Sequence, residues 1–299
     1  MKKLKRILIS ILSVPLLVVV VVLALLPFRL LYVLSSACAF LLYHVAAYRK
    51  KVVLNNLQKA FPEKTTEELQ HIARGFYRHL ADVMVEALKV MFASRATMRR
   101  RMQFTPEALK IINRHYVQQK SIIVVMGHYG NWEWIGPGFN LAHPRHLHSA
   151  YKPLRNKVFN QLILRVRSRF AHCLVPSDQV TRHLIKLDQN NQTMAFAMIA
   201  DQSASPRTAY WLPFFKHTTT FFTGPEKLAR KLNHPVVFCS IRKVKRGHYQ
   251  MHAEIITETP QQLPPQAITA QFARLLEAEV RREPQYYLWS HRRWKHVRE

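Results

Sequence analysis

The chain has 299 residues, and its 45 lysine and arginine residues against 17 aspartate and glutamate residues leave a formal charge of +28. Apolar residues make up 48% of it, which is enough for a full core and excludes wholesale disorder. Only seven residues are glycine, which excludes collagen-like repeats and glycine-rich linkers. The three cysteines are far apart and form no C-x-x-C pair, so a disulfide framework or a zinc knuckle is not expected. The charge requires an anionic partner, which can be nucleic acid, a membrane or an acidic protein.

The chain begins with two apolar segments. Residues 7–26 contain no charged side chain, and a helix of that length spans ~30 Å, the thickness of bilayer hydrocarbon. A second apolar run, residues 30–47, follows almost at once, and the combined length exceeds the ~7–15-residue core of a signal peptide. Basic clusters flank both sides, so the positive-inside rule places both flanks in the cytoplasm. We expect residues 1–48 to form a membrane anchor, either a helical hairpin or one inserted helix followed by an interfacial one, and residues 49–299 to form a cytoplasm-facing domain.

The remaining elements alternate between helix and strand. Thr65 and Glu68 have the spacing of a capping box, and apolar residues then repeat at helical spacing to about residue 91. Another helix begins at Pro106. Strands are predicted at residues 121–126, 148–151, 173–175, 194–200, 236–241 and 249–256, and helices after the first strand and at 153–170, 178–190, 224–233 and 268–282. This alternation predicts an α/β fold with a mostly parallel central sheet flanked by helices.

The turn after the first buried strand reads Gly-His-Tyr-Gly-Asn-Trp-Glu over residues 127–133, and four of the seven glycines fall at 127, 130, 136 and 138. Clustered glycine indicates unusual backbone geometry. Reacting groups in α/β sheets gather beyond the carboxyl ends of strands. We therefore expect Glu133 to hydrogen-bond His128 and fix its tautomer, so that the other ring nitrogen takes a proton. Without G-x-S-x-G or a nearby cysteine, the pair indicates direct activation of a substrate hydroxyl.

Other site types find little support. There is no phosphate-binding G-x-x-x-x-G-K-[ST] loop and no H-E-x-x-H zinc motif. His143, His146 and His148 lie close together, but the chain has 16 histidines, and we expect no metal site from them. On these residues alone, a helix-capping or core histidine is an equally good interpretation of His128.

The motif also carries a resemblance. His128 to Glu133 resembles the H-x4-[DE] motif of glycerolipid acyltransferases, and its HYGNWE form resembles the bacterial lipid A biosynthesis (late, or secondary) acyltransferase family. Further segments match that family in order, at residues 56–63, 151–154, 165–170, 200–202, 213–215, 223–225 and 287–295. The chain departs from the family at Lys216, where many relatives have glycine, and at residues 203–206, which lack the usual acidic or glycine residues. These departures leave the acceptor and the acyl chain open.

The resemblance implies transfer of a fatty acyl chain from acyl carrier protein, or a comparable thioester, to a hydroxyl of a lipid A precursor. The reaction takes place at the cytoplasmic face of the bacterial inner membrane and needs no cofactor. His128 is then the general base and Glu133 its partner. A lysophospholipid or an aminolipid is the alternative acceptor.

Further site residues follow from the same register. Backbone N–H groups near Gly130 and Asn131 are candidate donors to the reaction's oxyanion, and the glycines around them are expected to leave room for two acyl chains. Arg167 is expected to point inward and bind substrate, because an arginine fork suits phosphate. Arg165, on another face of the same predicted helix, and Asp201, at the end of a buried strand, are also expected to bind substrate.

The C-terminal segment interleaves aromatic and basic side chains from Trp289 to His296. Such a mixture can bind single-stranded nucleic acid or lie at lipid headgroups. The membrane anchor favours headgroups, so we expect no nucleic-acid partner. A membrane-tethered binder of nucleic acid or anionic lipid, without enzymatic activity, remains the interpretation that rests on charge alone.

Overall fold

A computed structural model describes residues 18–144, 147–154, 156–171 and 173–298. Most of the first predicted membrane segment, residues 7–17, therefore lies outside the described residues. Residues 18–25 are helical, and helix α2 (Phe28–Phe40) continues into the π-helical turn η1 (Leu41–Val45). Within the described ranges, residues 28–45 form one helix that is long and apolar enough to cross a membrane, by length and composition only.

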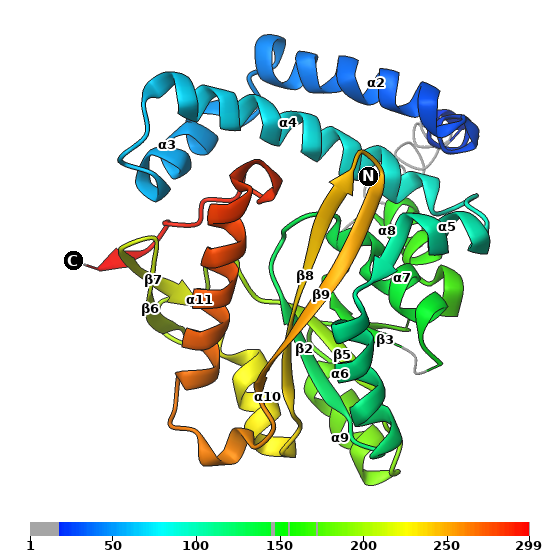
Figure 1. Ribbon diagram of the computed structural model, residues 1–299, viewed down its shortest axis with the longest axis vertical. Helices are drawn as coiled ribbons and strands as arrows, with labels where there is room; N and C mark the ends of the chain where they lie inside the picture. The colour runs from blue at the N-terminus through cyan, green and yellow to red at the C-terminus, as the bar shows by residue number, and fades with distance from the viewer. Residues whose placement is uncertain (1–17, 145–146, 155, 172, 299) are drawn as a thin grey trace, which may run out of the picture.

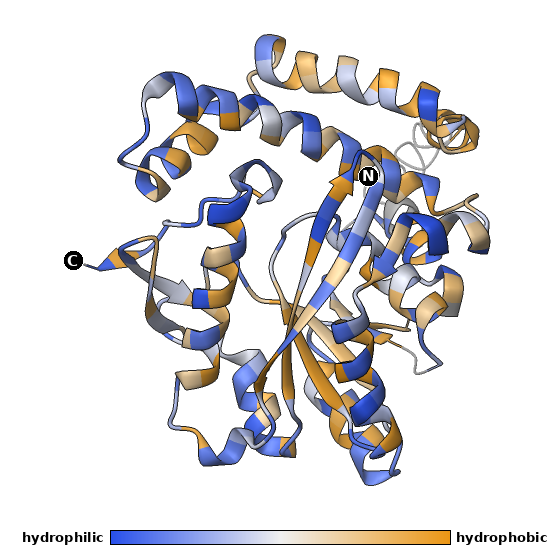
Figure 2. Cartoon of the chain, in the orientation of Figure 1, coloured by the Kyte–Doolittle hydropathy of each residue, from blue (hydrophilic) through white to orange (hydrophobic). Residues whose placement is uncertain are grey.

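Helix α2 lies along helix α4 (Thr66–Lys89) at one end of the molecule (Figure 1). The predicted capping box is confirmed, because the Thr65 side chain accepts from the Glu68 backbone and Glu68 accepts from the Thr65 backbone. Two short helices, α3 (Lys50–Ala60) and α5 (Arg95–Arg101), flank α4 in the chain and were not predicted. Apolar residues of α2 face outward (Figure 2), with Val33 66% exposed.

The central sheet has seven strands in the order β1-β9-β8-β2-β5-β3-β4. All neighbours are parallel except β8 and β9, which confirms the predicted α/β class with a mostly parallel sheet. The strands are β1 (Met102–Phe104), β2 (Ile122–Met126), β3 (Leu147–Tyr151), β4 (Cys173–Pro176), β5 (Ala195–Ile199), β8 (Val236–Lys245) and β9 (His248–Thr257).

Helices cover both faces of this sheet, as the alternation predicts. Strand β2 is buried throughout, and its side chains divide between two cores: Ile123 and Val125 face one, Ile122 and Val124 the other. The first core also contains residues of α4, α9 (Val180–Gln189), α10 (Gly224–Leu232) and α11 (Ala267–Arg282). The second contains residues of α5, α6 (Pro106–Val117), α7 (Ile135–Ala142) and α8 (Lys157–Arg167). Helix α8 begins four residues later than its prediction from Pro153.

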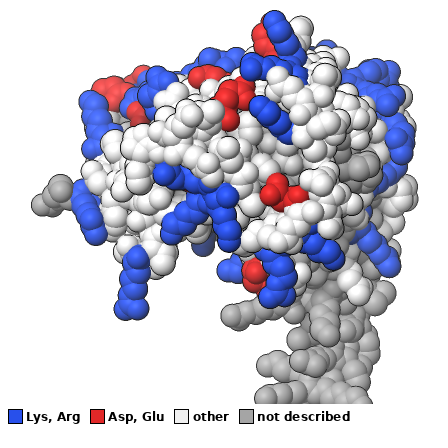
Figure 3. Space-filling model, turned by 90° about the horizontal axis from the view of Figure 1, so that it is seen from below, with Lys and Arg blue, Asp and Glu red and all other residues white. Residues whose placement is uncertain are grey.

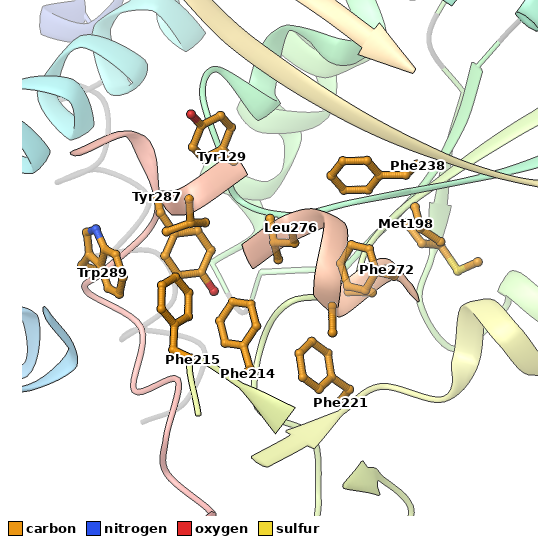
Figure 4. Close-up of a cluster of buried hydrophobic side chains, with 14 of the residues drawn as sticks. Tyr129, Met198, Phe214, Phe215, Phe221, Phe238, Phe272, Leu276, Tyr287 and Trp289 are labelled. Carbon is orange, nitrogen blue, oxygen red and sulfur yellow. The ribbon is translucent and has the colours of Figure 1, made fainter. Parts of the chain in front are cut away.

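A second, antiparallel sheet was not predicted; it consists of β6 (Tyr210–Phe214), β7 (His217–Phe221) and β10 (Val297–Arg298). It packs with the C-terminal segment around an aromatic cluster, part of which Figure 4 shows. Trp289 is 0% and Arg293 1% exposed, and the Arg293 guanidinium lies 4.1 Å from the centre of the Phe221 ring. The expectation that this segment lies at lipid headgroups is therefore wrong for Trp289, Arg293 and Trp294, because these side chains are buried in the aromatic cluster.

Candidate active site

Two loops leave the same edge of the sheet and bring His128 next to Asp201. Strands β2 and β5 are parallel neighbours, with Met126 opposite Ile199, and the Ala200 N–H donates to the Met126 carbonyl at 3.0 Å. His128 follows β2 by two residues and Asp201 follows β5 by two residues. Parallel pairing of these two strands therefore places two groups, 73 residues apart in sequence, side by side.

Asp201 holds the His128 ring through one nitrogen. His128 Nδ1 lies 2.6 Å from Asp201 Oδ1, and the backbone N–H of His128 donates to Oδ2 at 3.0 Å. Burial lowers the pKa of His128, but the charge and hydrogen bond of Asp201 outweigh it, so the pKa is raised overall. Burial raises the pKa of Asp201, yet its contacts with His128 bring it below its usual value. An ionised Asp201 thus fixes the Nδ1–H tautomer and leaves Nε2 as the basic nitrogen.

The structure corrects the predicted partner of His128. Glu133, in the 3-10 turn η2 (Trp132–Trp134), accepts two hydrogen bonds from Arg167, with Nε at 2.9 Å from Oε2 and Nη2 at 2.6 Å from Oε1. Its charge still contributes to raising the pKa of His128, after that of Asp201. Glu133 is therefore part of the site as the anchor of Arg167. Asp201, predicted as a substrate-binding residue, makes the contact that was assigned to Glu133.

The two predicted arginines of α8, Arg165 and Arg167, lie on different faces of the helix. Arg167 lines the cavity at His128, whereas Arg165 is exposed and is absent from the cavity lining. Residues two apart on a helix do not share a face. A substrate-binding role for Arg165 in this cavity is thus not supported by its position.

One of the two predicted oxyanion donors, the Gly130 N–H, already has a structural acceptor. The Gly130 N–H donates to the Tyr286 carbonyl at 3.0 Å, and the Asn131 side chain is fully buried. Gly130 has φ +61°, and a Cβ there would lie 1.7 Å from the Ile241 carbonyl oxygen. This close approach explains the glycine. The expectation that the glycines leave room for acyl chains is not supported at Gly130 or at Gly138, where a Cβ would meet the Met102 side chain.

A buried carboxyl group, not predicted from sequence, holds the loop that carries His128. Glu86 of α4 is 0% exposed, and its Oε2 accepts from Asn131 Nδ2 and from the Tyr249 hydroxyl, both at 2.7 Å. Its Oε1 accepts from the Tyr32 hydroxyl of α2 at 2.8 Å. Burial, the largest cause, raises the pKa of Glu86 to about 7. The sequence did offer a signal for this group, because Glu86 lies among the apolar residues that repeat at helical spacing between Val83 and Val90.

The C-terminal segment supports the loop from the other side. The Leu288 N–H donates to the His128 carbonyl at 3.1 Å, and His291 Nε2 accepts from the Ser203 N–H at 3.0 Å, two residues after Asp201. The nearby Arg293 charge helps to lower the pKa of Asp201, after the larger effects of His128. This explains why a segment that resembles a family motif lies in the core, close to the site.

His128 opens into a cavity of about 420 Å³. Its apolar wall consists of Met126, Trp132, Ile135, Leu174, Ala197, Met198, Ile199 and Phe222, and its polar groups include His128, Glu133 and Arg167. A largely apolar pocket with a few polar groups suits a ligand that has a hydrocarbon part and a polar reacting group. The arrangement suits proton removal from a hydroxyl beside such a chain.

Comparisons with known proteins give a consistent set of matches. A family model described as bacterial lipid A biosynthesis acyltransferase matches residues 1–296. The chain is 23% identical over 272 residues to a lipid A biosynthesis palmitoleoyltransferase of Escherichia coli (strain K12) and to a lipid A biosynthesis acyltransferase of Shigella flexneri. Each alignment covers 90% of this chain and 86% of the relative. A lipid A biosynthesis acyltransferase of Haemophilus influenzae is 23% identical over 278 residues, with the same coverage.

Proposed function

Because the chain belongs to the bacterial lipid A biosynthesis acyltransferase family and is thus an acyltransferase, we propose that it moves a fatty acyl chain from the thioester of acyl carrier protein to a hydroxyl of a lipid A precursor. The observation that carries the mechanism is the contact of the buried Asp201 with His128, which lines a largely apolar cavity. We propose that the reaction needs no resident cofactor.

The acceptor hydroxyl gives its proton to His128 Nε2 while its oxygen attacks the thioester carbonyl. Asp201 keeps the proton on Nδ1 and stabilises the imidazolium that forms. The tetrahedral intermediate then expels the carrier's thiolate, which takes the proton from Nε2, and an ester bond replaces the thioester bond. General-base catalysis of this kind contributes ~10²–10⁴-fold to the rate.

Arg167 has a supporting role in this proposal. Its guanidinium lies on the cavity wall, and the bidentate contact with Glu133 holds it in one orientation. A fixed cation beside the base suits an acceptor that carries phosphate, because a delocalised guanidinium binds phosphate oxygens without losing its charge. Glu133 thereby positions the arginine and offsets its unfavourable effect on protonation of His128.

We propose that the enzyme works at the inner membrane with its catalytic domain on the cytoplasmic side. Residues 7–26 are long enough to span the bilayer, and basic residues flank the anchor. Helix α2 buries Leu31, Ser35 and Ala39, and the Ser35 Oγ donates to Asp82 of α4 at 2.7 Å. Other apolar residues of α2, such as Val33, are exposed. With one side packed on α4 and apolar residues exposed on the other, α2 suits a position at the membrane interface, which favours one inserted segment followed by an interfacial α2 over a spanning hairpin.

The charge of the surface fits these partners. Lysine and arginine side chains are scattered over the face seen in Figure 3, and acidic ones are few. Bilayer headgroups, a phosphorylated glycolipid and an acidic carrier protein are all anions that such a surface attracts.

The test uses the purified full-length protein with labelled acyl carrier protein and a lipid A precursor. Wild type and the matched control His252→Ala, a half-buried histidine of β9, are expected to form product, and His128→Ala to lose at least about 100-fold. Equal turnover by His128→Ala contradicts the proposed base. The lipid mass spectrum of a deletion strain decides the acceptor: unchanged lipid A with altered phospholipids or aminolipids favours the alternative substrate.

A further inference from the structure

Three metal-binding side chains converge beside the catalytic cavity. His148 Nδ1, Cys173 Sγ and His183 come from β3, β4 and α9, and their ligand atoms all lie within 4.8 Å of one another. His148 Nδ1 is 2.9 Å from His183 Nε2. From the histidines clustered in sequence, at 143, 146 and 148, we expected no metal site. The fold instead brings His148 close to Cys173 and His183.

The topology explains why these residues meet. Strands β3 and β4 pair in parallel with His148 directly opposite Cys173, so both side chains project from the same face of the sheet. Helix α9 follows β4 in the chain and packs against it, and its His183 reaches the same point. Three separate elements thus deliver one donor atom each to a half-buried position.

We propose that His148, Cys173 and His183 bind a Zn²⁺ ion, with a water molecule as the fourth ligand. Two imidazole nitrogens and one thiolate form a donor set that zinc prefers and that Mg²⁺ and Ca²⁺ do not. Zinc–nitrogen bonds of ~2.0–2.1 Å and a zinc–sulfur bond of ~2.3 Å place tetrahedral donor atoms about 3.3–3.6 Å apart. The observed spacing approaches this, and side-chain shifts of about 1 Å complete it. Binding releases the Cys173 thiol proton to solvent, because the thiolate is the ligand.

The position of this site gives the metal a structural role. Strand β4 is the outer strand of the sheet, and Ser149 and Leu174, which follow His148 and Cys173 in the chain, line the cavity at His128 from the opposite face of the sheet. A bound ion links β3, β4 and α9 and so fixes one wall of that cavity. The zinc is distinct from the acyl-transfer step, and the inference does not depend on the proposed function.

The experiment measures metal binding by the purified full-length protein after removal of its affinity tag. Zinc content is determined by elemental mass spectrometry after equilibration with ZnCl₂, affinity by competition with a chromogenic chelator, and thiolate ligation by the charge-transfer absorption of a CoCl₂-loaded sample. The site variants are Cys173→Ser and His183→Gln. The matched controls are Cys38→Ser and His252→Gln, which change a half-buried cysteine and a half-buried histidine elsewhere.

We expect one zinc per chain and a thiolate–cobalt band in wild type and in both controls. Each site variant is expected to lose the band, and zinc affinity is expected to fall by more than the ~10–100-fold that loss of an outer-shell partner costs. Zinc should also raise the melting temperature of wild type and of neither site variant, which separates ligation from general misfolding. Substoichiometric zinc in wild type, or equal affinity in site variants and controls, overturns the proposal and leaves a hydrogen-bonded histidine pair.

Discussion

Replacing Asp201 by asparagine tests the central geometry of the site. The backbone N–H of His128 donates to one oxygen of Asp201, and His128 Nδ1 lies against the other. An asparagine that keeps the backbone bond must turn its NH₂ group toward Nδ1. Two donors cannot face each other, so the ring proton moves to Nε2, and the nitrogen that should accept the substrate proton is blocked.

The expected loss is large because the pair is buried. Asp201 is 2% exposed, so water does not replace its contact with the ring. The equivalent change in a Ser-His-Asp triad costs about 10⁴-fold in kcat. We therefore expect a loss of about 10²–10⁴-fold, which is about 2.7–5.4 kcal/mol of transition-state stabilisation.

The pH profile provides a second measurement. Activity needs neutral His128, so kcat/KM falls as the pH decreases through the pKa of His128. Asp201 raises this pKa and burial lowers it. Removing the carboxylate leaves the effect of burial, so the acidic limb of the residual activity should move to lower pH.

Two variants complete the test of Asp201. Asp178→Asn changes an exposed aspartate and should leave both the turnover rate and the acidic limb of the pH profile unchanged. Glu133→Gln should shift the limb less than Asp201→Asn does, because Glu133 raises the His128 pKa less than Asp201 does. The reasoning is refuted if Asp201→Asn stays within about 10-fold of wild type while Glu133→Gln abolishes activity.

Three further outcomes follow from the contacts around the site. Glu86→Gln leaves one of three hydroxyl or amide donors without an acceptor. The free energy of unfolding measured in urea should therefore fall by about 1–3 kcal/mol. An unchanged urea midpoint argues against the network. Gly130→Ala should cost more than the ~1–2 kcal/mol of a left-handed backbone, because its Cβ meets the Ile241 carbonyl, and normal thermal stability would exclude this close approach. Arg167→Lys loses the bidentate contact with Glu133 but keeps the charge, so KM for a phosphorylated acceptor should rise several-fold; an unchanged KM removes Arg167 from substrate binding.

Much of the local structure follows from short-range patterns. The capping box at Thr65 and the buried strand before His128 are both present, since helix caps and apolar runs depend on residues within a few positions. The hairpin of β6 and β7 was not predicted because apolar and polar residues alternate only weakly along its two strands. Strand β10 has only two residues, which is too short for such a pattern.

The C-terminal segment illustrates the limit of composition. Arg293 reads as a surface cation beside Trp294, yet the structure buries it against the rings of Phe214 and Phe221. A cation is stable there because aromatic faces and the Thr220 carbonyl replace part of its hydration. These partners lie about seventy residues away, so no local pattern indicates them.

By itself, the sequence determined the α/β alternation, the strongly basic character of the chain and the place of His128 after a buried strand. The tertiary structure alone decided which carboxylate contacts that histidine and which residues lie next to His148. Both depend on strand order: β2 pairs with β5, and β3 pairs with β4. Strand pairing is set by packing across the whole chain, so it brings together residues whose spacing in sequence carries no periodic signal.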